Sequence, residues 1–202
     1  MNRHAMPRYF AAGILLGLIV TACSNRSANN TARTDSAAVT TTSAGRAPAD
    51  SAMDDAAITA VLLVANTGDS SIGALAASRG VNSAVKQFGQ RMVREHGQLN
   101  RQVKALATRL GSSAREEDNR QAVDMKHDAD EEYRDLSAKT GTDFDHAYID
   151  HEIDDHEKVL HELDNKLIPA ADNAELRTLL NQARTAVQSH LDQARAIKNT
   201  LH

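Results

Sequence analysis

Aromatic residues and cysteine are both scarce in this chain of 202 residues. It has no tryptophan, three tyrosines and three phenylalanines, so it lacks the aromatic platforms on which single-stranded nucleic acid stacks. Its formal net charge is −4, and an acidic surface also disfavours binding to the phosphates of nucleic acid. Its one cysteine, Cys23, excludes a disulfide within the chain.

Signals for β-structure are absent from the sequence after about residue 52. No run of strand length alternates between apolar and polar residues, and no Asn-Gly or Asp-Gly pair marks a hairpin turn. Pro169 is the only proline in this part of the chain. These absences favour an all-α fold over any class that contains a sheet.

The first 22 residues are typical of an export signal. Arg3 and Arg8 flank the start of an apolar run over residues 9–20, which is too short to cross a bilayer comfortably as a helix. The run ends in Val20-Thr21-Ala22-Cys23, which resembles the bacterial lipobox. We therefore predict that residues 1–22 are a lipoprotein signal peptide and that Cys23 becomes the lipidated first residue of the mature protein. Several acyl chains on one residue give stable anchoring, since each buried methylene contributes about 0.8 kcal/mol.

This anchor predicts a place in the cell envelope. Ser24 follows the cysteine where an aspartate would typically signal retention in the inner membrane, so we expect the outer membrane, with the protein facing the periplasm. Residues 23–52 are rich in Ser, Thr, Ala and Asn and show no apolar periodicity, which predicts a disordered tether. As a flexible coil this tether would span about 30 Å, enough to hold a domain clear of the lipid headgroups.

Residues 53–202 form one domain large enough to bury a single core. Apolar residues recur there at steps of three and four, and Gly80, Gly111, Gly141 and Pro169 break the pattern. Helices are predicted over about residues 54–79, 82–110, 114–139, 142–167 and 173–202, with Thr142 as the N-cap of the fourth and Pro169 ending it. Short connections favour an up-and-down bundle of four core helices, with the more polar third helix on its outside.

Four of these helices carry one ionisable residue inside an otherwise apolar stripe: Asp69, His96, His156 and His190. Each lies near the middle of its helix. Counted from the connecting turns, the partners in each antiparallel pair differ in level by roughly 4 to 5 Å, which is less than one helical turn. We therefore expect the four side chains to meet in the core. Glu152, one turn before His156, is a candidate further ligand or a hydrogen-bond acceptor for a ligand.

A carboxylate with three neutral imidazoles suits a single transition-metal ion, with zinc, iron, manganese or copper all compatible. A ferritin-type di-iron centre would need Glu-x-x-His on two helices. Val93, Ile153 and Val187 occupy the positions three before the histidines, so that motif is absent. The alternative is a metal-free structural or interaction module whose buried polar residues fix the helix register.

A hydrolytic enzyme finds little support in the sequence. No Gly-x-Ser-x-Gly motif is present, and lipidation would consume the only thiol. We assign no catalytic residues and no enzyme class.

Several short motifs follow one another along the helical part of the sequence. The motifs are Gly68-Asp69, Ile72-Gly73-Ala74-Leu75-Ala76, Val85-Lys86-Gln87-Phe88, Met92-Val93-Arg94-Glu95-His96, Phe144-Asp145-His146-Ala147-Tyr148, His156 and His190. Together they resemble a known family, the exported ferritin-like bacterial proteins of the domain of unknown function 4142 (DUF4142) family. The resemblance covers about residues 55–200, and its order and spacing are more specific than any one motif. The resemblance implies a ferritin-like bundle in the cell envelope and no established biochemical activity. Members usually have Glu at the position of Asp69 and Asp at the position of Glu95.

Overall fold

The computed structural model describes residues 53–111 and 119–201, which are almost entirely helical and contain no strand. The predicted all-α fold is therefore confirmed for this part of the chain. The expected signal peptide, tether and lipidated Cys23 lie outside the described residues. The elements are α1 (Asp55–Arg79), α2 (Ser83–Arg109), α3 (Arg120–Ser137), α4 (Gly141–Glu162), the π-helical η2 (Leu163–Leu167), the short α5 (Ile168–Ala170) and α6 (Ala174–Lys198).

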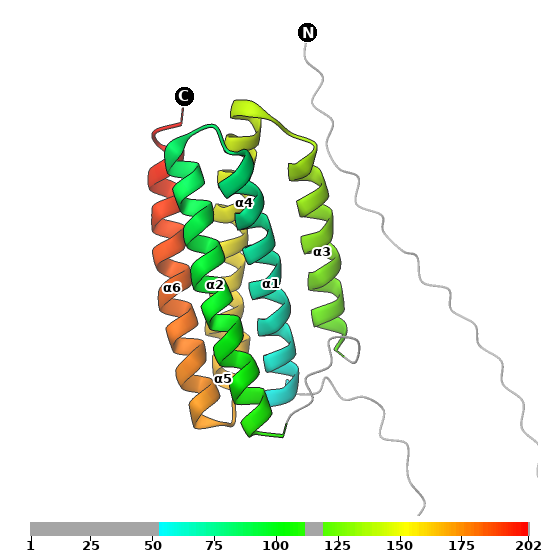
Figure 1. The fold of residues 1–202 in the computed structure, drawn as a ribbon. Coiled ribbons are helices and arrows are strands. Elements are labelled where there is room, and N and C mark those ends of the chain that lie inside the picture. The colour runs from blue at the N-terminus through cyan, green and yellow to red at the C-terminus, as the bar shows by residue number, and fades with distance from the viewer. Residues whose placement is uncertain (1–52, 112–118, 202) are drawn as a thin grey trace, which may run out of the picture. The chain divides into compact units, whose positions relative to one another are not determined.

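The long helices run alternately up and down along the bundle (Figure 1). α1 packs most extensively on α2, α4 packs on α6, and α2 also packs on α6, so these four helices enclose the core. α3 lies on the flank of the bundle against α1 (Figure 1). This is the predicted arrangement of four core helices and one outer, more polar helix. The return path through α3 makes the connection from α2 to α4 a long one, as in bundles with a crossover.

Side-chain caps explain where most of these helices begin. A short polar side chain at the N-cap accepts hydrogen bonds from backbone N–H groups that have no partner in the first turn. The Asp54 carboxylate accepts from the Ala57 N–H at 2.7 Å, and the Asn173 amide oxygen accepts from the Leu176 N–H at 3.0 Å. The other caps of this kind are Asn82 for α2 and Asn119 for α3. The predicted starts of the first, second and fifth helices are thus confirmed.

The predicted start of the fourth helix was wrong. Its N-cap is Thr140 instead of Thr142, and the helix begins at Gly141, whose φ of 62° allows the sharp turn out of α3. Asp145 takes no part in capping its own helix. Its buried carboxylate accepts the N–H groups of Val81 at 3.1 Å and Asn82 at 2.6 Å, which are free because α1 has ended there. This contact ties the α1–α2 turn to α4.

The predicted end of the fourth helix was also wrong, because Pro169 does not stop it. The chain continues through the wider turn of η2, in which the Ile168 N–H bonds the Leu163 carbonyl, and through α5 to Ala170. Pro169 has no N–H to donate, and the wider turn accommodates its ring without ending the helix. The third helix begins at Arg120; residues 114–118 of its predicted range lie outside the described part of the chain.

Glycines bring α1 and α2 unusually close together. A Cβ added to Gly89 would lie 2.5 Å from the carbonyl oxygen of Gly73 and 2.7 Å from the nitrogen of Ala77. Two helix backbones can approach this closely only where no side chain separates them. By length and composition α1 could also cross a membrane, but 56% of its most apolar window is buried within the bundle.

The apolar core is divided into two clusters along the bundle. The cluster at the α1 N-terminal end includes Ile58, Val103, Leu163 and Leu180. The cluster at the other end is built around Phe88, Phe144, Tyr148 and Ile149. On each of the four core helices, the residues between these two clusters include the ionisable position singled out in the sequence. A polar layer therefore interrupts the core at one level.

Candidate metal centre

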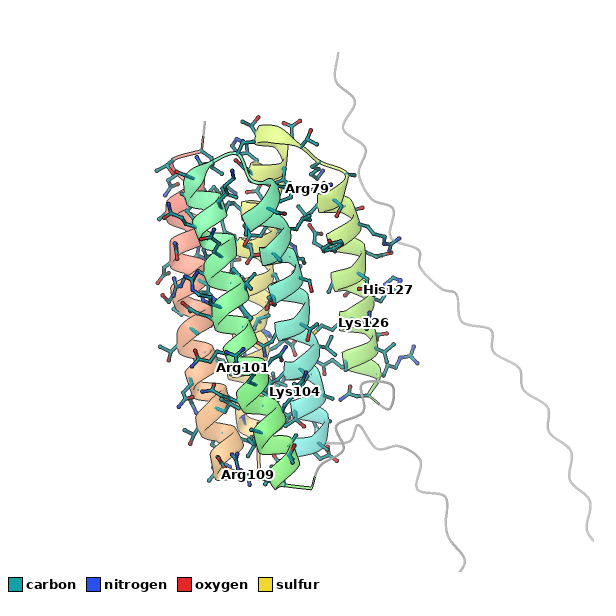
Figure 2. All side chains as sticks on the ribbon, in the orientation of Figure 1. Arg79, Arg101, Lys104, Arg109, Lys126 and His127 are labelled. Carbon is teal, nitrogen blue, oxygen red and sulfur yellow. The ribbon has the colours of Figure 1, made fainter. Side chains whose placement is uncertain are left out.

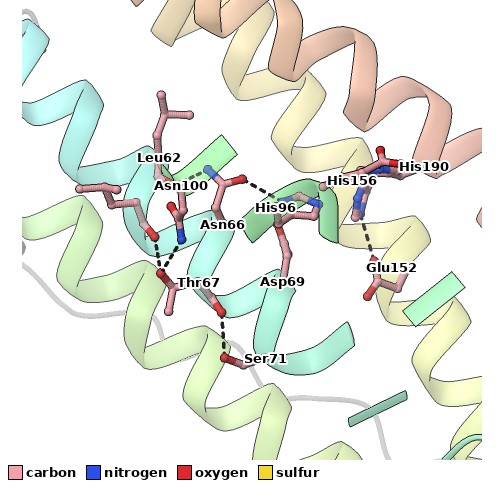
Figure 3. Close-up of polar contacts among 12 residues, drawn as sticks. Leu62, Asn66, Thr67, Asp69, Ser71, His96, Asn100, Glu152, His156 and His190 are labelled. Atoms are coloured by element: carbon pink, nitrogen blue, oxygen red, sulfur yellow. Dashed lines mark hydrogen bonds and ion pairs between the residues drawn. The ribbon is translucent and has the colours of Figure 1, made fainter. Parts of the chain in front are cut away.

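The polar layer brings together side chains from all four core helices (Figure 3). Asp69 comes from α1, His96 from α2, His156 from α4 and His190 from α6. The three histidines are 4%, 2% and 1% exposed, respectively. The three histidines therefore meet in the core, and Asp69 lies beside His96.

The three imidazoles form a compact cluster, which we call the histidine cluster. Their ring centroids are 5.1 Å apart for His96 and His190, 5.4 Å for His156 and His190, and 6.0 Å for His96 and His156. One nitrogen of each ring lies within 4.8 Å of one nitrogen of each of the others. Nitrogens bound tetrahedrally to one zinc ion are about 3.3 Å apart, so an ion bound here would draw the rings together.

His96 is oriented from α1. Its Nδ1 lies 2.9 Å from Asn66 Oδ1 and 3.2 Å from Asp69 Oδ2. The Asn66 amide nitrogen donates to the Leu62 carbonyl at 2.6 Å, which fixes its oxygen toward the ring. Because both neighbours are acceptors, Nδ1 carries the proton and donates it. The lone pair of Nε2 is left buried and without a partner.

His190 is oriented in the opposite sense. Its Nε2 lies 2.8 Å from Glu95 Oε2, so the nitrogen without a partner is Nδ1. Glu95 in turn accepts a hydrogen bond from Arg91 Nε at 2.8 Å. The Glu95 side chain is 39% exposed and therefore connects the buried ring to the surface.

His156 has the poorest set of partners. Its Nδ1 lies 3.4 Å from Glu152 Oε2, and neither ring nitrogen makes a hydrogen bond. Both carboxylate oxygens of Glu152 and the hydroxyl of Tyr148 are also buried, and these two side chains interact with each other without a well-formed hydrogen bond. A buried polar atom left unpaired costs about 1–3 kcal/mol, so this part of the layer would gain from any ligand that supplies partners.

Burial keeps the three imidazoles neutral. It lowers the pKa of His96 and of His190 to about 4. The pKa of His156 falls well below the usual value, chiefly because of burial and also because positive charges on neighbouring imidazoles would repel each other. Neutral imidazole is the form that binds metal, so the cluster is ready to coordinate at neutral pH.

Burial acts in the opposite direction on the acids beside the cluster. It raises the pKa of Asp69 to about 7 and that of Glu152 well above its usual value. Glu95 differs: partial burial acts to raise its pKa, but hydrogen bonds and charges from Arg91 and His190 bring it below the usual value. Glu95 is thus the acid of the layer that remains ionised most readily.

The predicted ligand residues fall into two groups in space. His96, His156 and His190 form the cluster, whereas Asp69 and Glu152 each lie beside the Nδ1 of one ring. Asp69, with Asn66, lies where it can orient the ring of His96, the arrangement that commonly supports histidine ligands, whereas Glu152 lies nearest to His156 without a hydrogen bond to it.

Asn66 and Glu95 were not predicted as site residues. A clue to Asn66 was its place one turn after Leu62 on the buried face of its helix. Glu95 precedes His96 directly, and nothing in its spacing distinguishes it from a solvated residue.

A second grouping of possible ligands, His127, Asp128 and Glu131, lies exposed on α3, and Figure 2 shows His127 on this flanking helix. Exposed acidic groups of this kind are well solvated and have no need of an ion. The histidine cluster is therefore the candidate centre in the described part of the chain.

Comparison with known proteins gives a family and no activity. The profile of the domain of unknown function DUF4142 matches residues 39–197. No curated protein and no solved structure matches the chain. Because the matched segment covers most of the sequence, the chain belongs to the DUF4142 family.

Proposed function

We propose that this protein is a lipid-anchored protein of the cell envelope that binds one transition-metal ion through His96, His156 and His190. The observation that carries this proposal is the free, buried nitrogen on each of three neutral imidazoles from three different helices. One cation would provide a partner to all three nitrogens at once and would offset the cost of burying them.

The surroundings of the cluster support a metal centre. Histidine ligands usually donate their second nitrogen to a carboxylate or carbonyl, which fixes the ring orientation. Here Asp69 and Asn66 face His96, Glu95 faces His190, and Glu152 lies nearest to His156.

Three imidazoles favour zinc, iron or copper over manganese, which prefers oxygen ligands. A centre with three protein ligands also leaves a position open. Such a centre suits metal sequestration or protection against metal or oxidative stress.

The place in the envelope rests on the sequence of the N-terminus. The lipobox-like Val20-Thr21-Ala22-Cys23 and the polar segment that follows support an anchor at Cys23 and a domain held away from the membrane. Ser24 favours the outer membrane. A periplasmic domain would meet metal ions that enter the envelope before the cytoplasm does.

The test is to purify the protein and measure bound metals by elemental mass spectrometry, with thermal melts before and after chelation. About one equivalent of one metal per chain is expected, and His156→Ala should abolish it. His161→Ala is a matched control, because His161 is exposed on the same helix. Stoichiometric metal in His156→Ala would contradict the proposal.

The second candidate is a metal-free structural or interaction module. It is favoured by the hydrogen bonds that join helices across the layer, from His96 to Asn66 between α2 and α1 and from His190 to Glu95 between α6 and α2. On this view the polar layer fixes helix register at a cost in stability. His96→Leu would then fold at least as stably as the parent, and chelators and added ions would leave the melting temperature unchanged.

A further inference from the structure

A surface groove leads toward the histidine cluster between α2 and α6. Its volume is about 300 Å³. Its lining includes Glu95, His96 and His190. Two of the three clustered histidines therefore border the same groove, although both are almost fully buried.

Glu95 stands where this groove meets the cluster. One of its oxygens contacts His190 Nε2 at 2.8 Å, and the other accepts from Arg91. Arg91 also donates to Gln193 at 2.6 Å and to Ser189 at 3.0 Å, so it links α2 to α6 beside Glu95. A partly exposed, ionised carboxylate in this position attracts cations from solvent to the ring behind it.

The rest of the lining is uncharged. Gln98, Gln102 and Gln182 contribute neutral amide groups, which can replace water around an ion without holding it as tightly as a carboxylate does. The other lining residues are apolar: Leu99, Ala183, Ala186 and Val187. The groove carries no Lys or Arg among its lining residues.

The other approach to the cluster, from α1 and α4, is less open. Asp69 and Asp155 lie on that side, and the Asp69 side chain is only 14% exposed. α3 also covers α1 there (Figure 1).

We propose that the groove between α2 and α6 is the entrance through which a divalent cation reaches the histidine cluster, with Glu95 as its first contact. This inference rests on the proposed function, since it presupposes that the cluster binds metal.

The experiment measures the rates at which cobalt(II) chloride loads the full chain and EDTA removes it, by stopped-flow absorbance in detergent. A Cys23→Ser background removes the only thiol. Ala186→Phe and Gln182→Trp narrow the groove, and Gln182 is exposed, so its replacement leaves the core intact. Each should slow loading and removal by the same factor, at least fivefold, with Kd unchanged, because a barrier on a path affects both directions equally.

Ala105→Phe is the matched control for the groove. Ala105 lines a neighbouring groove between the same two helices, which shares Gln102 and Gln182 with the first groove but has no histidine in its lining. Its replacement should leave both rates unchanged.

Glu95→Gln tests the first contact. It should slow loading about tenfold at low ionic strength, and added salt should reduce the difference. Glu157→Gln is the control, because Glu157 is also paired with an arginine, Arg195, but between α4 and α6.

Three results would be decisive against these ideas. If cobalt loads and leaves both groove variants at the rates of the parent, the groove is not the entrance. If Asp155→Asn in addition slows loading, the route between α1 and α4 is the entrance instead. A parent chain that binds no cobalt would instead overturn the proposed metal site itself, so the two failures are distinguishable.

Discussion

At the scale of single residues, burial in the polar layer shifts the pKa values of acids and of imidazoles in opposite directions. Burial holds His96 and His190 neutral by lowering their pKa values to about 4, and it holds Asp69 partly protonated by raising its pKa to about 7. Between pH 4 and 6.5 the histidines bind fewer protons in the folded state than in the unfolded state. Their contribution therefore makes stability rise with pH in this range.

Asp69 makes stability depend on pH in the opposite direction. Its folded pKa of about 7 lies above the unfolded value of 3.8, so the folded state binds more protons between these pH values and stability falls as pH rises. Asp69→Asn removes this contribution. Relative to the parent, the metal-free variant should gain stability as pH rises from 4 to 7, by about 1 kcal/mol per pH unit at most.

Urea unfolding at several pH values, with a chelator present, measures this difference. Asp154→Asn, an exposed change on α4, serves as the control and should follow the parent. Parallel curves for Asp69→Asn and the parent would show that Asp69 titrates normally in the folded protein.

At the scale of helices, the contact between α1 and α2 depends on Gly73 and Gly89. Gly89→Ala places a methyl group 2.5 Å from a backbone oxygen and should destabilise the fold by about 2–4 kcal/mol, because two packed helices must separate. The free energy of unfolding from urea titration measures the cost.

Gly97 on the same helix provides a matched control for this prediction. A Cβ there would meet only the end of the flexible Arg101 side chain, at 3.8 Å. Gly97→Ala should therefore stabilise the protein by about 0.5–1 kcal/mol through helix propensity. Equal effects of the two substitutions would argue against a close α1–α2 contact.

At the scale of the whole molecule, one ion in the histidine cluster would join α2, α4 and α6. A ligand at one hundred times its Kd stabilises the folded state by about 2.7 kcal/mol, which corresponds to a rise of roughly 5–10 °C in Tm for a domain of this size. Zinc chloride should raise the Tm of the parent by this amount and that of His190→Ala by much less. Scanning calorimetry measures both, and an equal rise in the two proteins would locate the bound zinc elsewhere.

Attachment to the membrane is also a property of the whole chain. Cys23→Ser should abolish incorporation of a radiolabelled fatty acid into the protein, because lipidation requires the thiol. Metabolic labelling followed by immunoprecipitation tests this, with Ser24→Ala as a control that keeps the cysteine. Equal labelling of Cys23→Ser and the parent would contradict lipidation at Cys23.

The sequence alone determined the helical class, most helix limits and the level of the polar layer. Apolar spacing and N-cap residues such as Asp54 and Asn173 are local signals, and each core helix carries its own polar residue between apolar ones. The errors at Thr142 and Pro169 arose where distant groups or a wider helical turn changed the local preference.

Only the tertiary structure decided which atoms face each other. Whether a histidine presents Nδ1 or Nε2 depends on partners that lie on other helices. The spacing of Asn66 indicates only that it is on the buried face of its helix, and Glu95 does not differ locally from an ordinary helix residue. The same is true of the groove between α2 and α6, since these helices are far apart in the sequence. Periodicity gives the face and level of a side chain, whereas the orientation of its ring is set by hydrogen bonds across the bundle.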